Sequence, residues 1–234
     1  MIGYAVAAIH RWWPTWPAHL GLRPSPCRNC LVHRAPHVLA GIAPDPYILR
    51  ASTELWRVYT RGGHHPRSWN TFRSYGPVKT MRFDHHEEPV REQDRKILYG
   101  ASRIPICIAE FFQVGRMIDR DRGEPWLVGF TVVRDVTLLK LCGTWPTRAG
   151  ASMAINTGRR DRARQWSRAV YDAYPHIEGL WYPSSMYANQ PAFAFYERAE
   201  ESLAETPFFH MPLSAPGLYA ALDGMAREIG YRFS

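Results

Sequence analysis

The order of strand-like and helix-like segments constrains the fold of this chain more than any other feature of its sequence. Apolar or alternating runs predict strands at 55–59, 78–84, 96–102, 126–133, 136–142, 179–185 and 191–197. Helical periodicity predicts helices at 105–118, 159–175 and 216–230. The adjacent runs 126–133 and 136–142 are expected to pair as a hairpin. Because the two kinds of segment do not alternate strictly, the sequence predicts an α+β fold with mixed, mostly antiparallel sheets and flanking helices.

The segment 159–175 is the clearest helix in the sequence. Its apolar stripe is formed by Ala163, Trp166, Val170 and Tyr174. These residues recur at helical spacing on one face. The pattern stops at Pro175, because proline cannot continue a helix.

Residues 1–51 are rich in proline and tryptophan and differ from the rest of the chain. Closely spaced prolines permit only short helices and turns, so we expect an irregular N-terminal extension followed by one domain at 52–234. The extension holds Cys27 and Cys30 at a spacing that can clamp zinc. Only His33 and His37 lie near, at spacings that fit a zinc site poorly, so we favour free thiols.

The sequence carries no signal for a membrane or a secretory route. It has no run of about 18 apolar residues, so no membrane span is expected. The apolar start of the chain is short and lacks a basic n-region. Four cysteines in 234 residues do not make a disulfide framework. We therefore expect a cytoplasmic protein.

The chain is basic, with a formal net charge of +8. Such a balance indicates an anionic partner: a nucleotide, a nucleic acid or an acidic protein. Nucleic-acid-binding proteins typically carry a clustered basic stripe. Here the basic residues are spread, apart from a cluster at 159–168 on the polar face of the predicted helix. Direct nucleic-acid binding is therefore not expected, and it stands as an alternative of another class.

The usual catalytic signatures are absent: the sequence has no P-loop, GxGxxG, GxSxG or HExxH. Adjacent His85 and His86 rarely share one metal ion, so we expect a solvated loop there. What remains is a set of polar residues on apolar segments. The set consists of Arg57, Arg82, Tyr99, Glu110 and Ser184. Each also has an ordinary interpretation as an exposed strand position, a polar helix position or a turn residue.

Four parts of the sequence resemble the blocks of the RES domain family. LWRVY supplies Arg57, and MRFD supplies Arg82. ILYGAS and IAEFF together place Tyr99 eleven residues before Glu110, and GLWYPSS supplies Ser184. The blocks occur in the right order and span about 52–215. The chain therefore resembles a RES domain.

This resemblance implies an enzyme that consumes NAD+ and whose fold is similar to that of ADP-ribosyltransferase toxins. It implies cleavage of the nicotinamide–ribose bond by hydrolysis or phosphorolysis, with transfer of ADP-ribose to a protein as the alternative. It also implies a toxin whose antitoxin, an Xre-type helix-turn-helix protein, covers the active site. NAD+ would be the substrate, and no metal is expected.

The roles implied by the resemblance suit the chemistry of the five residues. Glu110 would stabilise the oxocarbenium-like ribose or hold its 2′-hydroxyl. Arg57 and Arg82 would fork onto the pyrophosphate. Tyr99 would stack on the nicotinamide, and Ser184 would hydrogen-bond the ribose or the carboxamide. The implied catalytic set is Glu110, Arg57 and Ser184, and the implied NAD+-binding set is Arg57, Arg82, Tyr99 and Ser184.

Departures from the family pattern leave some alternatives open. Met81 stands where the family has glycine, which leaves the role of Arg82 open. Ser185 beside Ser184 makes the family serine ambiguous by one position. The extension 1–51 can shield the pocket, form a homo-oligomer or replace part of an antitoxin. A catalytically silent interaction protein is a further alternative, and the intact Arg, Tyr, Glu and Ser set argues against it.

Overall fold

The computed structural model describes residues 39, 41–63 and 65–234. Most of the predicted extension, including Cys27 and Cys30, lies outside the described residues. Its last part does not: residues 46–49 form a strand that pairs with residues 136–139. Among the described residues, no helix combines the length and the apolar character that a membrane span requires.

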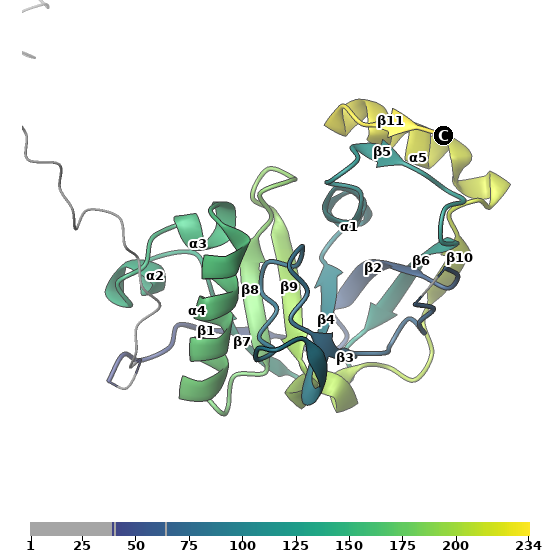
Figure 1. Cartoon of the computed structure of the whole chain (residues 1–234). Coiled ribbons are helices and arrows are strands. Elements are labelled where there is room, and N and C mark those ends of the chain that lie inside the picture. Colours follow the sequence, from purple (N-terminus) through teal and green to yellow (C-terminus); the bar gives the residue numbers. More distant parts are fainter. Residues whose placement is uncertain (1–38, 40, 64) are drawn as a thin grey trace, which may run out of the picture. The chain divides into compact units, whose positions relative to one another are not determined.

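The described residues form a mixed fold of strands and helices (Figure 1). The strands are β1 (Pro46–Leu49), β2 (Glu54–Thr60), β3 (Arg73–Gly76), β4 (Arg91–Ala101), β5 (Met117–Ile118), β6 (Pro125–Thr131), β7 (Val136–Lys140), β8 (Gly179–Pro183), β9 (Pro191–Tyr196), β10 (Phe209–Pro212) and β11 (Arg232–Phe233). The helices are α1 (Ile104–Phe111), α2 (Trp145–Arg148), α3 (Ala154–Thr157), α4 (Arg160–Ala173) and α5 (Tyr219–Ile229), with 3₁₀ turns η1 (Glu197–Ser202) and η2 (Pro216–Leu218).

Most strands belong to one sheet with the order β1-β7-β8-β9-β4-β2-β6-β10, and β3 pairs with β4 beside this path. Within this sheet β7 and β8 run parallel, and the other described neighbours are antiparallel. β5 and β11 form a separate parallel pair. The predicted α+β fold with a mostly antiparallel sheet is confirmed.

Helix α4 covers the part of the sheet that contains β8 and β9 (Figure 1). The predicted stripe Ala163, Trp166, Val170 and Tyr174 is fully buried. It packs in one apolar cluster with Leu180 of β8 and Ala194 of β9. Burial of this face stabilises the helix, as the periodicity of the sequence predicts.

The sheet opens between β2 and β4. These two strands pair at a single position, Trp56 with Ala101. Beyond it, β4 pairs with β3 instead of β2, from Ile97 opposite Arg73 to Arg91 opposite Gly76. Helix α1 packs against both β2 and β4 at this opening (Figure 1). The strands therefore diverge where Arg57 follows the last pair.

The runs at 126–133 and 136–142 form β6 and β7, but the predicted hairpin is wrong. β6 lies between β2 and β10, whereas β7 lies between β1 and β8. The connecting residues bond elsewhere: Arg134 pairs with Glu178, and Asp135 pairs with Arg50. Local sequence does not reveal that β2 pairs along the whole of β6.

The segment 78–84 is a loop, so the strand predicted there is wrong. Side chains of α4, rather than a neighbouring strand, donate hydrogen bonds to the backbone carbonyls of this loop. Arg164 Nη1 donates to the carbonyl of Lys79 at 2.9 Å, and Ser167 Oγ donates to the carbonyl of Phe83 at 2.8 Å. Arg164 is thereby buried, which corrects the expectation that the basic cluster of this helix faces solvent.

The predictions of the two remaining helices differ in accuracy. The prediction for 105–118 is too long: α1 ends at Phe111, Arg116 adopts φ 46°, and the last two residues form β5. A left-handed residue interrupts an α-helix. The prediction for 216–230 is confirmed as η2 followed by α5, which ends at Gly230 with φ 68°.

Candidate functional site

A pocket lies where β2 and β4 diverge. Arg57 enters it from β2, Tyr99 from β4, Glu110 from α1 and Arg82 from the loop before β4. Ser184 lies behind Glu110 and is fully buried. The structure therefore brings all five sequence-predicted residues to one place, although they come from separate elements.

The two adjacent serines have different positions at the end of β8. Ser184 Oγ donates a hydrogen bond to Glu110 Oε1 at 2.5 Å and accepts one from the backbone N–H of Met186 at 3.2 Å. Ser185 lines the pocket. Ser184 thus orients the carboxylate, while Ser185 is the serine that faces the space where a ligand would bind.

Sequence reasoning missed two residues that support Glu110. Gln113 donates through Nε2 to the carbonyl of Glu110 at 2.8 Å, and Arg160 donates through Nη2 to Gln113 Oε1 at 2.8 Å. Both residues line the pocket. Gln113 lies one turn beyond Glu110 and Arg160 belongs to the basic cluster, but their contact depends on tertiary structure.

Burial raises the pKa of Glu110. The hydrogen bond from Ser184 and the charges of Arg82 and Arg160 oppose this rise. A carboxylate that is partly desolvated but fixed by hydrogen-bond donors strongly stabilises positive charge that develops nearby, because little water screens the interaction.

Arg57 is a buried cation that forms no ion pair with another described residue. It is 9% exposed, and among the described residues its Nη1 has no hydrogen-bond partner. Burial, followed by repulsion from Arg67, lowers its pKa to about 9. The guanidinium therefore stays charged at neutral pH, and an anion in the pocket would relieve its desolvation.

Arg82 and Tyr99 are held more firmly than Arg57. Arg82 Nη1 donates to the carbonyl of Gly158 at 2.7 Å. Burial and the charge of Arg160 lower its pKa, while Glu110 raises it. The backbone N–H of Phe83 donates to the hydroxyl of Tyr99 at 3.3 Å. Burial raises the pKa of Tyr99, so it presents a neutral ring to the pocket.

Asn156 is a pocket residue that the sequence did not single out. It is 1% exposed and lies in α3. Its Nδ2 donates to the carbonyl of Leu141 at 2.7 Å. Its Oδ1 has no partner among the described residues.

The loop that carries Arg82 is anchored behind the pocket by a buried carboxylate. Asp84 is fully buried and accepts hydrogen bonds from Arg73 Nη2 at 2.7 Å, from the N–H of Val78 at 2.6 Å and from His86 Nδ1. Burial alone would raise the pKa of Asp84, but the bond from His86 and the charge of Arg73 hold it well below its usual value. His86 is fully buried, so the expected solvated loop at His85 and His86 is wrong.

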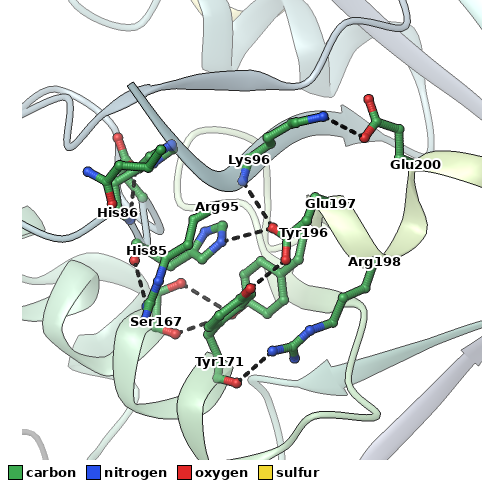
Figure 2. A network of polar contacts seen from close by, with 12 residues as sticks. His85, His86, Arg95, Lys96, Ser167, Tyr171, Tyr196, Glu197, Arg198 and Glu200 are labelled. Atoms are coloured by element: carbon green, nitrogen blue, oxygen red, sulfur yellow. Dashed lines mark hydrogen bonds and ion pairs between the residues drawn. The ribbon is translucent and has the colours of Figure 1, made fainter. Parts of the chain in front are cut away.

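His85 belongs to a second part of this network (Figure 2). It is fully buried, and its Nε2 lies 3.5 Å from Glu197 Oε2. Glu197 also accepts hydrogen bonds from Tyr171 Oη at 2.5 Å and from the N–H of Lys96 at 3.0 Å. Burial would raise the pKa of Glu197, but the contact with His85, followed by the bonds from Tyr171 and Lys96, lowers it to about 2. Burial lowers the pKa of His85 to about 4, so its ring is neutral at pH 7.

No cluster in the described part of the chain has three or more metal-ligating side chains placed to hold an ion. The lining of the pocket offers a carboxylate, guanidinium groups, phenols and amides. Such a set suits an anionic ligand that carries hydrogen-bonding groups.

Known proteins supply an independent comparison. The fold is similar to a chain in the "Crystal structure of the M.tuberculosis MbcT-MbcA toxin-antitoxin complex", with a TM-score of 0.50 and 14% sequence identity. The match covers 76% of this chain and 92% of that chain. None of the proteins of curated function matches this sequence. The family model described as the RES domain matches residues 54–214, and the chain belongs to the RES domain family.

Proposed function

We propose that this RES-domain protein is an enzyme that cleaves the nicotinamide–ribose bond of NAD+. The observation that carries the proposal is that one pocket holds both a carboxylate fixed by hydrogen-bond donors and a buried cation with a nitrogen that has no partner among the described residues. Glu110 supplies the carboxylate, and Arg57 supplies the cation. A dinucleotide offers a diphosphate for the cation and a ribose that becomes positive during cleavage for the carboxylate.

In this mechanism, the bond between the ribose C1′ and the pyridinium nitrogen breaks, and both electrons leave with nicotinamide. The leaving group is thereby neutralised and needs no general acid. The ribose becomes oxocarbenium-like, and Glu110 stabilises its positive charge. Ser184 fixes the carboxylate through its 2.5 Å hydrogen bond. Water or inorganic phosphate then attacks C1′ and gives ADP-ribose or its 1-phosphate.

The other pocket residues position the substrate in this proposal. Arg57 would bind the diphosphate through its guanidinium, whose Nη1 has no partner among the described residues. Arg82 is attracted by the charge of Glu110, which raises the pKa of its guanidinium. It would contact the diphosphate or the adjoining ribose. Tyr99 would stack on the nicotinamide, because its hydroxyl is held by the loop and fixes its ring.

An antitoxin is the partner that we propose for this enzyme. The similar fold comes from a complex whose title names a toxin and an antitoxin. On this chain, α1 exposes Phe111, which is 40% exposed and lines the pocket, and Val114 follows at 83%. An exposed apolar side chain in the pocket lining, with another three residues further on, supports a protein that covers this surface. Co-expression with an Xre-type antitoxin should suppress NAD+ loss.

The direct test is NAD+ consumption by the purified full chain, with and without inorganic phosphate. Loss without phosphate indicates hydrolysis, and loss that requires phosphate indicates phosphorolysis. Glu110→Gln should reduce the rate by about 100-fold or more. The matched control Glu205→Gln, at an exposed position, should retain it. Consumption only in the presence of a cell extract, with label from ADP-ribose on a protein, would favour ADP-ribosyl transfer instead.

A further inference from the structure

Two buried polar atoms of the pocket wall lack partners, and they have opposite hydrogen-bonding character. Among the described residues that line the pocket, they are Arg57 Nη1 and Asn156 Oδ1. The first is a charged donor, and the second is a neutral acceptor. A ligand that satisfies both must carry an anionic group and, separately, an N–H or O–H group. Arg57 is already assigned to the diphosphate, so Asn156 needs a donor of its own.

The orientation of the Asn156 amide follows from its other contact. Nδ2 donates to the carbonyl of Leu141 at 2.7 Å. If the amide were flipped, Oδ1 would face this carbonyl oxygen, and two acceptors would repel each other. At 1% exposure the side chain also has little room to move. Oδ1 is therefore the amide atom that remains available to the pocket.

Asn156 belongs to the wall of the pocket that surrounds Glu110. It lies two residues before Gly158, whose carbonyl binds Arg82. It lies four residues before Arg160, which is linked through Gln113 to Glu110. The link through Arg160 and Gln113 associates Asn156 with Glu110, and so with the reacting end of the proposed substrate.

We propose that Asn156 is a specificity-determining residue that accepts a hydrogen bond from the carboxamide N–H₂ of the nicotinamide group. This inference rests on the proposed function. Near Glu110, the ribose hydroxyls already have a carboxylate to accept their hydrogen bonds, so the carboxamide is the donor that is left. A pyridine ring with a carboxylate in place of the carboxamide has no donor and would be repelled by Oδ1. The site therefore selects nicotinamide dinucleotides over nicotinic acid dinucleotides.

The test compares NAD+ with nicotinic acid adenine dinucleotide as substrates of the full chain. The wild type should consume NAD+ with a kcat/KM at least about tenfold higher, because a buried acceptor left without its donor discriminates strongly. Asn156→Ala should bring the ratio of the two kcat/KM values close to one. The matched control Asn70→Ala, at an exposed turn, should behave as the wild type.

Because each ratio is measured on one preparation, a partly unfolded variant does not distort it. Binding of ADP-ribose, which lacks the nicotinamide, should change less than about twofold in Asn156→Ala. An equal loss of affinity for ADP-ribose and NAD+ would mean that Asn156 contacts the ribose, and it would overturn the inference. Equal use of both dinucleotides by the wild type would overturn it while leaving NAD+ cleavage intact. If the wild type consumes neither, the proposed function fails, and the inference fails with it.

Discussion

The pocket wall and the polar network behind it differ in whether their buried charged groups have partners. In the network, the charged groups are paired: Asp84 with Arg73 and His86, and Glu197 with Tyr171 and the N–H of Lys96. The buried atoms without a hydrogen-bond partner there are ring nitrogens of His85 and His86, among the described residues. In the pocket, one guanidinium nitrogen and one amide oxygen have no partner among the described residues. A paired buried charge is part of the folded structure, whereas an unpaired one lowers stability until a ligand arrives.

The two regions share one loop, 78–86. Its front supplies Thr80 and Arg82 to the pocket. Its back supplies Asp84 and the two histidines to the network. The network thus holds in place a segment without regular secondary structure that the pocket uses. Substitutions in the network should mainly change stability, and substitutions in the pocket should mainly change activity.

The largest effect is expected for Asp84→Ala. It would leave Arg73, which is 7% exposed, buried without a counter-ion. Removing one partner of a buried ion pair costs about 3–5 kcal/mol of the free energy of unfolding. Urea denaturation would measure the loss. The exposed control Asp121→Ala should change stability by less than about 0.5 kcal/mol. A loss below about 1 kcal/mol for Asp84→Ala would contradict the proposal that the network stabilises the fold.

Arg57→Met should have the opposite signature. It removes an unpartnered buried cation, so the free energy of unfolding should stay constant or rise, by about 1–3 kcal/mol at most. NAD+ consumption should fall about 100-fold or more. The control is Arg50→Met, at a 74% exposed ion pair, which should change neither quantity appreciably. A clear drop in the stability of Arg57→Met would show that Arg57 serves the fold, and the contrast between the regions would fail.

The third prediction concerns the pH dependence of stability. His85 has a pKa of about 4 in the folded protein and 6.5 as its ordinary value. Below pH 6.5 the unfolded chain therefore binds a proton that the folded protein does not, and stability falls between pH 6.5 and 4. The slope for one such proton is at most about 1.4 kcal/mol per pH unit. Glu197, with its pKa lowered to about 2, adds a further loss as the pH falls below 4.5.

His85→Phe should flatten the upper part of this profile. The ring of His85 lies 4.6 Å from that of Tyr171 and 4.4 Å from that of Tyr196, so an aromatic replacement suits the site. Urea titrations at pH 7, 6, 5 and 4 would measure the slope. The exposed control His176→Phe should keep the wild-type slope. An unchanged slope in His85→Phe would mean that His85 is protonated in the folded protein as well.

The sequence allowed prediction where the signal is local. β2, β4, β8, β9 and α4 follow from alternation, apolar runs and helical periodicity, and Arg57 and Tyr99 lie in β2 and β4. The pairing of strands was not predictable in the same way. The β6–β7 hairpin looked natural from its spacing, but the long ladder between β2 and β6 determines the arrangement.

Burial of polar residues was equally hard to predict, because their partners come from distant segments. His86 and Asp84 look like surface residues until Arg73 is placed beside them. Asn156 gave no signal, since an asparagine two residues before a glycine is ordinary where a chain turns. The role that we propose for it depends on the carbonyl of Leu141, a tertiary contact that occupies Nδ2 of the amide.

The smallest expected effect distinguishes the two serines at the end of β8. The hydroxyl of Ser184 donates to Glu110 and opposes the rise in its pKa that burial causes. In Ser184→Ala the pKa of Glu110 should therefore rise further, so less carboxylate is present at a given acidic pH. The acid limb of kcat/KM for NAD+ should move to higher pH, by up to about one unit, which is the free energy of one neutral hydrogen bond.

Ser185→Ala is the matched control for this shift. Ser185 lines the pocket, and Glu110 accepts its short hydrogen bond from Ser184 instead. Its substitution should therefore raise KM without moving the acid limb. A shift of the limb in Ser185→Ala rather than in Ser184→Ala would exchange the two roles. In that case Ser185, and not Ser184, would lower the pKa of Glu110. The pKa of this carboxylate would then depend on a pocket-lining residue rather than on the buried serine behind it.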